Sequence, residues 1–207
     1  MNSPLYNISY RHSPDNEDTR WLQAAGEMAD RIRETDWSRS PLGPSSAWPQ
    51  SLRSSLELCL GSKFPMFLWW GDELRVFYND PYIPIAGPNK HPQFLGQPAR
   101  EMWGEIWPVI GPLIEQVQST GIATWSENLP LFMVRKGFLE ETYFTFSYSA
   151  ARDDLGRVNG IFCACHETTE RVVGDRRLNV LRELGAHEAR TETEAALLSA
   201  QALATNL

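Results

Sequence analysis

One stretch of the chain constrains its fold most, residues 65–81, which read PMFLWWGDELRVFYNDP. Met66 to Trp70 form an apolar run rich in aromatic residues, and Leu74 to Tyr78 form a second strand-like run. Gly71-Asp72-Glu73 supplies the turn between the two runs, and Asn79-Asp80-Pro81 breaks the second one. The pattern therefore predicts a β-hairpin.

Three further strands are predicted in the second half of the chain. They cover Trp125 to Val134, Leu139 to Ser149 and Val158 to His166, with turn signals between them. The middle strand has two alternating sets of side chains, with Tyr143, Thr145 and Ser147 on one face and Phe144, Phe146 and Tyr148 on the other. Together with the hairpin, these strands predict an α+β domain built on a five-stranded antiparallel sheet.

Helices are predicted on both sides of the hairpin. Residues 1–18 lack periodicity and are predicted to be a disordered leader. From Thr19 onward Trp21, Ala25, Met28 and Ile32 fall at helical spacing, with Asp18 or Thr19 as the N-cap. A second helix is predicted from Pro49, with Gly61 as its C-terminal cap.

The segment after the hairpin is predicted to be helical but interrupted. Prolines and glycines between residues 81 and 100 allow only short helical turns. A longer helix follows from Met102 to Val117, bent or restarted near Pro108 and Pro112 and ended by Gly121. Helical periodicity returns at Thr168, and a capping box at Thr191 predicts one more helix.

Composition excludes several classes of function. The 207 residues carry a formal net charge of -7, which gives no basic surface for nucleic acid or an anionic membrane. No apolar run is long enough to span a bilayer and no signal segment is present, so we expect a cytoplasmic protein. The three cysteines lack the spacing of a disulfide framework or a zinc site, and no metal is predicted. The excess is aromatic, with 8 Trp, 6 Tyr and 9 Phe.

The hairpin also carries a resemblance to a known family. A hydrophobic strand, a Gly-acidic-acidic turn and a strand ending in Tyr-Asn-Asp resemble the beginning of PAS sensor domains, above all those of bacterial sensor histidine kinases. Upstream, residues 36–60 read DWSRSPLGPSSAWPQSLRSSLELCL and are similar to a signature of one such group. Downstream, Glu167-Thr168-Thr169-Glu170-Arg171 resembles the sequence that closes the last PAS strand.

This resemblance implies a domain organisation. It places an N-terminal helical extension at residues 19–61, the PAS domain at 62–169 and a C-terminal signalling helix at 170–190. Residues 191–207 are then expected to begin a further, GAF-like domain, with a kinase core beyond it, so that the chain is a fragment of a longer protein. In the family the helix that leaves the sheet pairs with its twin, which implies a homodimer.

The candidate ligand site lies between the sheet and the helices, where PAS domains have their cavity. The candidates are the aromatic residues and strand cysteines Trp69, Tyr82, Trp103, Trp107, Tyr143, Phe146, Cys163 and Cys165. Cys163 and Cys165 share a face of the last strand with Ile161. An ordinary filled aromatic core without a ligand is the alternative.

No cofactor is identified by the sequence. Flavin is disfavoured because the Asn-Cys-Arg-Phe-Leu motif of photoactive PAS domains is absent and Cys59 precedes the sheet. Haem is disfavoured because His91 lies in a proline-flanked turn, which is a poor place for an axial ligand.

Catalysis by this segment is not expected. The chain has no nucleophile elbow, phosphate-binding loop, zinc-protease motif or dinucleotide turn. His187 begins a sequence similar to that of kinase phosphoacceptor helices, but Glu192 replaces the proline of that motif, so a linker residue is the better interpretation.

The resemblance to PAS domains therefore implies a sensory input domain that binds a small, largely apolar ligand. A fatty-acid-type quorum signal is one candidate for the ligand, and the 168–190 helix would transmit its occupancy to a kinase core and a response regulator. Glu167, Thr168, Thr169, Glu170 and Arg171 are the predicted coupling residues between sheet and helix. The alternatives are a ligand-free module for dimerisation or docking and the sensor of a cyclic-dinucleotide enzyme.

Overall fold

The protein forms two compact units that divide between Glu167 and Thr168 in the computed structural model. The structure describes residues 19–186 and 192–206. The predicted leader (1–18), His187 and Thr191 lie outside the described residues. The N-terminal extension (19–61) and the sheet belong to the first unit, and the two C-terminal helices form the second.

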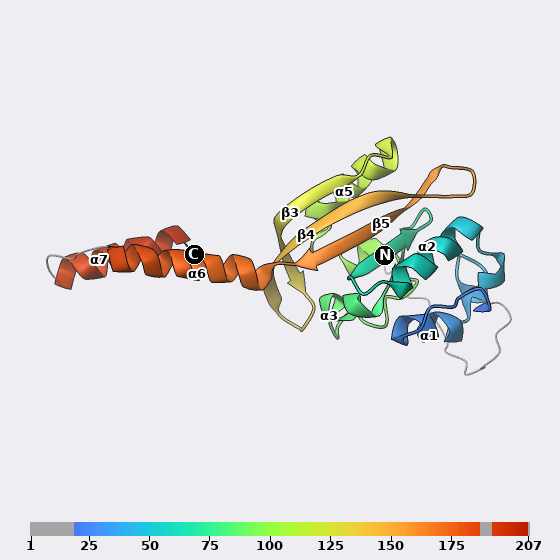
Figure 1. Ribbon diagram of the computed structural model, residues 1–207, viewed down its shortest axis with the longest axis horizontal. Coiled ribbons are helices and arrows are strands. Elements are labelled where there is room, and N and C mark those ends of the chain that lie inside the picture. Colours follow the sequence, from blue (N-terminus) through green and yellow to red (C-terminus); the bar gives the residue numbers. More distant parts are fainter. Residues whose placement is uncertain (1–18, 187–191, 207) are drawn as a thin grey trace, which may run out of the picture. The chain divides into compact units, whose positions relative to one another are not determined.

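The first unit is built on one antiparallel sheet of five strands, as the sequence predicts (Figure 1). In chain order the strands are β1 (Met66–Trp70), β2 (Arg75–Tyr78), β3 (Thr124–Val134), β4 (Leu139–Arg152) and β5 (Val158–Glu167). Their order across the sheet is β2-β1-β5-β4-β3, so the hairpin pairs with the last strand. The α+β class is confirmed, and this strand order is that of a PAS-like fold.

The β1–β2 hairpin forms as predicted. Trp70 pairs with Arg75, and the turn between them places both Gly71 (φ 79°) and Leu74 (φ 51°) in the left-handed region. Glycine adopts this conformation without cost, whereas leucine rarely does. Leu74 is held there because its amide donates to the Gly71 carbonyl and its own carbonyl accepts from the Ala99 amide.

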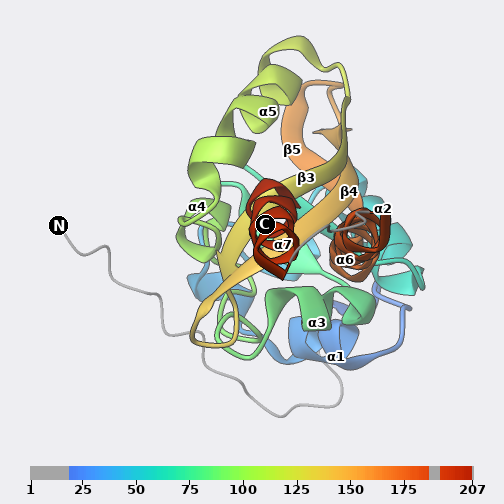
Figure 2. The ribbon, with the colours of Figure 1, turned by 90° about the vertical axis from the view of Figure 1, so that its left-hand side faces the viewer.

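Helices cover the two faces of the sheet unequally. Helix α2 (Gln50–Gly61) contacts β1 and β2, whereas α5 (Trp107–Thr120) contacts β3, β4 and β5. Figure 2 shows α4 (Ala99–Met102) and α5 on one side of the strands and α2 on the other. The four-residue helix α3 (Ile83–Ala86) follows a 3-10 turn at Asp80–Tyr82.

The alternation of β1 places its side chains in two different layers. Phe67 and Trp69 face the α5 side, where they line a cavity described below. On the opposite side, Trp37 and Trp48 of the N-terminal extension pack on Phe77 of β2 with ring centroids 5.4 and 5.5 Å apart. The signature segment around these two tryptophans therefore covers the outer face of the hairpin.

The first helix starts later than the sequence predicts. Helix α1 spans Glu27–Glu34, so the predicted start at Thr19 and the predicted cap at Asp18 or Thr19 are wrong. The cap comes from elsewhere, because the Asp80 carboxylate accepts from the amides of Glu27 (2.9 Å) and Met28 (2.8 Å). A Cβ atom on Gly26 (φ 123°) would lie 2.2 Å from Asp80 Oδ2, so this contact requires glycine.

The predicted interruptions of the later helices are confirmed. The predicted 102–117 helix is divided into α4 and α5, with Pro108 in the first turn of α5 and Pro112 inside it. Gly121 (φ 68°) ends α5 in the left-handed conformation, with its amide bonded to the Val117 carbonyl. Helix α2, in contrast, is capped by Ser62, because Gly61 is still helical.

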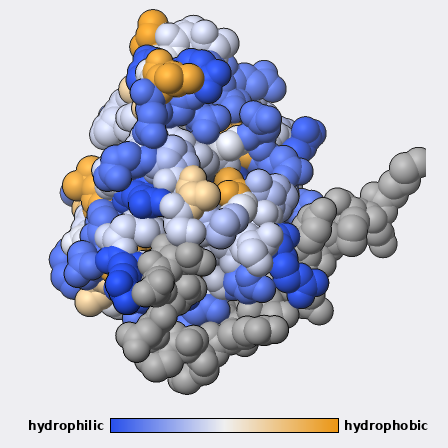
Figure 3. All heavy atoms as spheres, turned by 90° about the vertical axis from the view of Figure 1, so that its right-hand side faces the viewer, coloured by the Kyte–Doolittle hydropathy of each residue, from blue (hydrophilic) through white to orange (hydrophobic). Residues whose placement is uncertain are grey.

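The second unit consists of α6 (Thr169–Ala186) and α7 (Glu192–Asn206), which contact each other. Helices are thus found in both places where the periodicity predicts them. Among the described helices none is both long enough and apolar enough to cross a membrane. The end of the molecule shown in Figure 3 is largely hydrophilic, with a few separate hydrophobic spots.

Candidate functional site

A small cavity lies in the core between the inner face of the sheet and helices α3 to α5. Its volume is about 30 Å³, which is room for about one water molecule. The walls are aromatic and aliphatic, with two thiols. The lining residues are Phe67, Trp69, Tyr82, Ile85, Trp103, Ile106, Ile110, Leu131, Met133, Phe144, Phe146, Tyr148, Cys163 and Cys165.

Most of the residues predicted for the ligand site lie on this wall. The structure brings six of the eight together around the cavity, namely Trp69, Tyr82, Trp103, Phe146, Cys163 and Cys165. Cys163 and Cys165 both face inward from β5, as their spacing predicts. Trp107 and Tyr143 are not part of the lining.

Tyr143 lies on the other face of β4 from Phe144 and Phe146, which line the cavity. Its hydroxyl donates to the Glu141 carboxylate at 2.7 Å. Tyr143 and Phe146 therefore do not share one wall of the cavity, because strand positions of opposite parity face opposite sides of a sheet.

Trp107 lies one layer further out than predicted. Its ring stacks on that of Trp69 at a centroid distance of 6.1 Å, and it lines an open surface groove of about 420 Å³. A Cβ atom on Gly111 would lie only 3.1 Å from the indole nitrogen of Trp107, so the absence of a side chain at Gly111 makes room for this ring. Trp107 therefore stands between the cavity and the surface groove.

The sequence prediction missed several lining residues. Phe67, Phe144 and Tyr148 have the same strand parity as their predicted neighbours Trp69 and Phe146, and strict use of that parity would have found them. The aliphatic residues of α5 carried no comparable signal, because their spacing is equally typical of any helix packed on a core.

The polar atoms of the cavity are held in their neutral forms. Burial, followed by the neighbouring thiols of Cys165 and Cys163, raises the pKa of Tyr82 well above its usual range. The pKa of Tyr148 is raised in the same way. Burial and then the adjacent Cys165 raise the pKa of Cys163. Tyr82 and Tyr148 are therefore present as phenols, and Cys163 as a thiol.

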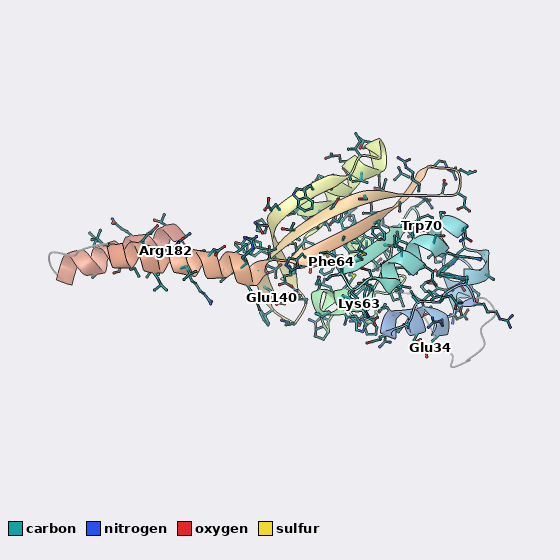
Figure 4. All side chains as sticks on the ribbon, in the orientation of Figure 1. Glu34, Lys63, Phe64, Trp70, Glu140 and Arg182 are labelled. Carbon is teal, nitrogen blue, oxygen red and sulfur yellow. The ribbon has the colours of Figure 1, made fainter. Side chains whose placement is uncertain are left out.

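A buried ion pair lies at the end of the sheet where β5 leaves the first unit. The Arg135 guanidinium, from the β3–β4 turn, binds both carboxylate oxygens of Glu167 at 2.8 and 2.9 Å. It also contacts the Glu140 carboxylate at 3.3 Å, and its side chain is only 7% exposed. The hydrogen bond to Glu167 is the main reason why the pKa of Arg135 is raised. Figure 4 labels Glu140 near this end of the sheet.

His91 and Cys59, the residues considered for haem and flavin, do not line the cavity. His91 Nδ1 lies 2.9 Å from the Tyr78 hydroxyl and its Nε2 lies 2.9 Å from a Glu27 carboxylate oxygen. An axial haem bond would have to displace one of these contacts. Cys59 is not part of the cavity lining, and burial raises its pKa to about 12. Within the described ranges, no group of three or more His, Cys, Asp and Glu side chains is arranged to hold a metal ion.

Comparisons with known proteins find similarity only to solved structures, at low sequence identity. No family model matches the chain, and no curated protein matches it. Among solved structures, the PAS domain of Bordetella pertussis BvgS is 19% identical with a TM-score of 0.46 and covers 64% of this chain and 96% of its own.

Two further solved structures are similar to this chain at comparable identity. A Rhodobacter sphaeroides LOV protein is 15% identical with a TM-score of 0.48 and covers 75% of this chain and 93% of its own. Phage VqmA in complex with DPO is 16% identical with a TM-score of 0.40 and covers 75% of each chain. At these identities the likeness concerns the fold alone.

Proposed function

We propose that this chain is a signal-input domain that responds to a small, largely apolar ligand bound between the sheet and helices α3 to α5. The observation that carries the proposal is the cavity itself, a small space with aromatic walls in the core of the PAS-like fold. A fatty-acid-type signal would suit the apolar walls, but the lining residues offer no cation for its carboxylate.

A ligand larger than a water molecule must displace part of the wall, because a cavity of about 30 Å³ is far below the usual few hundred Å³ of a ligand pocket. We infer that the part of the wall that moves is the segment 103–112. Pro112 cannot donate the helical hydrogen bond to Pro108, and Gly104 and Gly111 lack side chains that would fix their positions. This segment carries Trp103 and Trp107, so its displacement would enlarge the cavity towards the surface groove.

Occupancy would reach the second unit through the end of β5. Cys163 and Cys165 touch the cavity, and two residues further on Glu167 is held by Arg135. Thr168, Thr169, Glu170 and Arg171 follow directly and open α6. We infer that these residues couple the sheet to α6, and that α6 conveys the signal to a kinase core in the parent protein.

The test is native mass spectrometry of the purified protein, with solvent extraction and an absorbance scan from 300 to 700 nm. A small molecule that co-purifies in stoichiometric amount supports the sensory function. Loss of that molecule in a variant that fills the cavity, Cys163→Phe, locates it. A protein that carries nothing and binds no member of a library of small apolar compounds contradicts the proposal.

A second function is favoured by the small size of the cavity. A nearly solid core is what a ligand-free module for dimerisation or docking requires. The α6 side chains of Leu178 and Leu181 are 52% and 64% exposed and could pack against a second copy of the helix. This function predicts a dimer that dissociates in the double variant Leu178→Ser/Leu181→Ser, with no effect of small apolar compounds on stability.

A further inference from the structure

The hydroxyl groups of Tyr82 and Tyr148 are the strongest hydrogen-bonding groups on the cavity wall. Each tyrosine is 4% exposed, and within the part of the chain that the structure describes neither hydroxyl has a hydrogen-bond partner. The Tyr78 hydroxyl, by contrast, is bonded to His91. Neither hydroxyl is among the fully buried side-chain atoms without a partner, so each keeps some accessible surface on which it can donate a hydrogen bond to a guest molecule.

The two tyrosines approach the cavity from different elements. Tyr82 comes from the 3-10 turn after β2, and Tyr148 comes from β4. The ring of Phe67 contacts both, with centroid distances of 5.3 Å to Tyr82 and 6.1 Å to Tyr148. Because burial raises the pKa of both hydroxyls, both keep their protons at neutral pH and act as donors.

The wall has no charge with which to bind an ion. Its residues are aromatic, aliphatic or thiol-bearing, and none carries a charged side chain. Three buried cations of this unit, Arg75, Lys90 and Arg135, lie outside the lining and are paired with Glu73, Glu105 and Glu167. An ionised guest would lose its hydration without gaining a counter-charge, which is a large penalty.

We propose that the ligand is a small, neutral, flat molecule with an apolar ring and one hydrogen-bond acceptor, such as a carbonyl oxygen or a ring nitrogen. The acceptor accepts a hydrogen bond from the Tyr82 or Tyr148 hydroxyl, and the ring packs against the aromatic side chains of Phe67, Trp69 and Phe146. This inference rests on the sensory function proposed above and specifies the ligand class of the same site. Offset packing of rings explains the preference for a flat guest.

Three probe molecules of the same size separate the ligand classes. Acetophenone is neutral and has an acceptor, ethylbenzene has the same ring without an acceptor, and benzoate is an anion. Binding is followed by methyl NMR at Ile110 and Met133 on the wall, with the 66% exposed Ile122 as the reference. Because one buried hydrogen bond distinguishes the probes, acetophenone should bind about fivefold to tenfold more tightly than ethylbenzene, and benzoate should not bind.

Tyrosine-to-phenylalanine variants assign the effect to the two hydroxyls. Tyr82→Phe and Tyr148→Phe should each reduce the preference for acetophenone, and the double variant should abolish it while the affinity for ethylbenzene stays unchanged. Tyr143→Phe is the matched control, because it makes the same change on the opposite face of β4. It should leave all three affinities unchanged.

The experiment distinguishes a failure of the proposed ligand class from a failure of the proposed sensory function. If ethylbenzene or benzoate binds at the wall as tightly as acetophenone, the ligand class is wrong and the sensory function stands. The same holds if the double variant keeps the full preference for acetophenone. If no probe shifts the Ile110 and Met133 signals, either in the natural protein or in a Trp107→Ala variant, the inferred ligand class is wrong, whereas the sensory function fails only if the mass-spectrometry and library tests described above are also negative.

Discussion

Replacement of Arg135 by Met tests whether the end of β5 is held by a buried cation. The variant leaves Glu167, 29% exposed, and Glu140, 10% exposed, without their main counter-charge. Removing one partner of a fully buried pair costs about 3–5 kcal/mol, and partial solvation of Glu167 lowers the expected cost to about 2–3 kcal/mol. For a unit of this size that corresponds to a fall of roughly 5–10 °C in the melting temperature.

The assay is thermal unfolding followed by circular dichroism, together with hydrogen exchange of the β5 amides. Arg157→Met is the matched control, because Arg157 pairs with Asp153 in another turn but its side chain is 73% exposed. It should cost less than about 1 kcal/mol. In the double variant Arg135→Met/Glu167→Gln the loss should be smaller than the sum of the single losses. Equal costs for Arg135→Met and Arg157→Met, or unchanged exchange near Glu167, would refute the reasoning.

Three further outcomes are expected. Asn79→Ala should lower stability by about 2–4 kcal/mol in urea unfolding, because the buried side chain bonds the Met66 amide and three carbonyl groups. The control Asn89→Ala changes an exposed residue and should have little effect. Equal urea midpoints for the two variants would contradict the prediction. Trp107→Ala should open the cavity and increase the fluorescence of a hydrophobic dye, so an unchanged signal would rule out its role as a wall. The Asp154 carboxylate accepts hydrogen bonds from Ser51 and Gln50, which lower its pKa. Its contribution to stability is therefore present above about pH 4 and is lost as the pH falls through the folded-state pKa. The difference in melting temperature between the natural protein and Asp154→Ala should shrink on acidification.

The sheet could be predicted from the sequence because its signals are local. The hairpin combines aromatic strands with a Gly-acidic turn. In the later strands polar and apolar residues alternate, and turn residues flank each strand. Each strand can therefore be recognised from about ten consecutive residues. The start of α1 could not be predicted in this way. Its cap is the Asp80 carboxylate, more than fifty residues away in sequence, and no local pattern encodes a cap supplied by tertiary contact.

The sequence predicts which strand residues line the candidate site, because side chains alternate between the two faces of a strand. Cys163 and Cys165 share a parity and both reach the cavity, whereas Tyr143 does not share that of Phe146 and lies on the other face. The position of Trp107 depends on how α5 is rotated, and neither parity nor spacing fixes that. The degree of filling was beyond prediction as well, because a hollow and a filled aromatic core have the same hydrophobic pattern.

The N-terminal extension is a structural part of the first unit, and three polar contacts explain why. Asp80 after β2 caps α1, Asp154 of the β4–β5 turn caps α2, and Asn79 joins the end of α2 to the start of β1. Each contact satisfies backbone groups of the extension with a side chain from the sheet region, so neither part completes its hydrogen bonding alone. The outer face of the hairpin would also lose its cover of Trp37 and Trp48. We therefore expect a truncated chain that begins at residue 62 to be less stable than one that begins at Thr19, because the signature segment 36–60 covers and stabilises the hairpin.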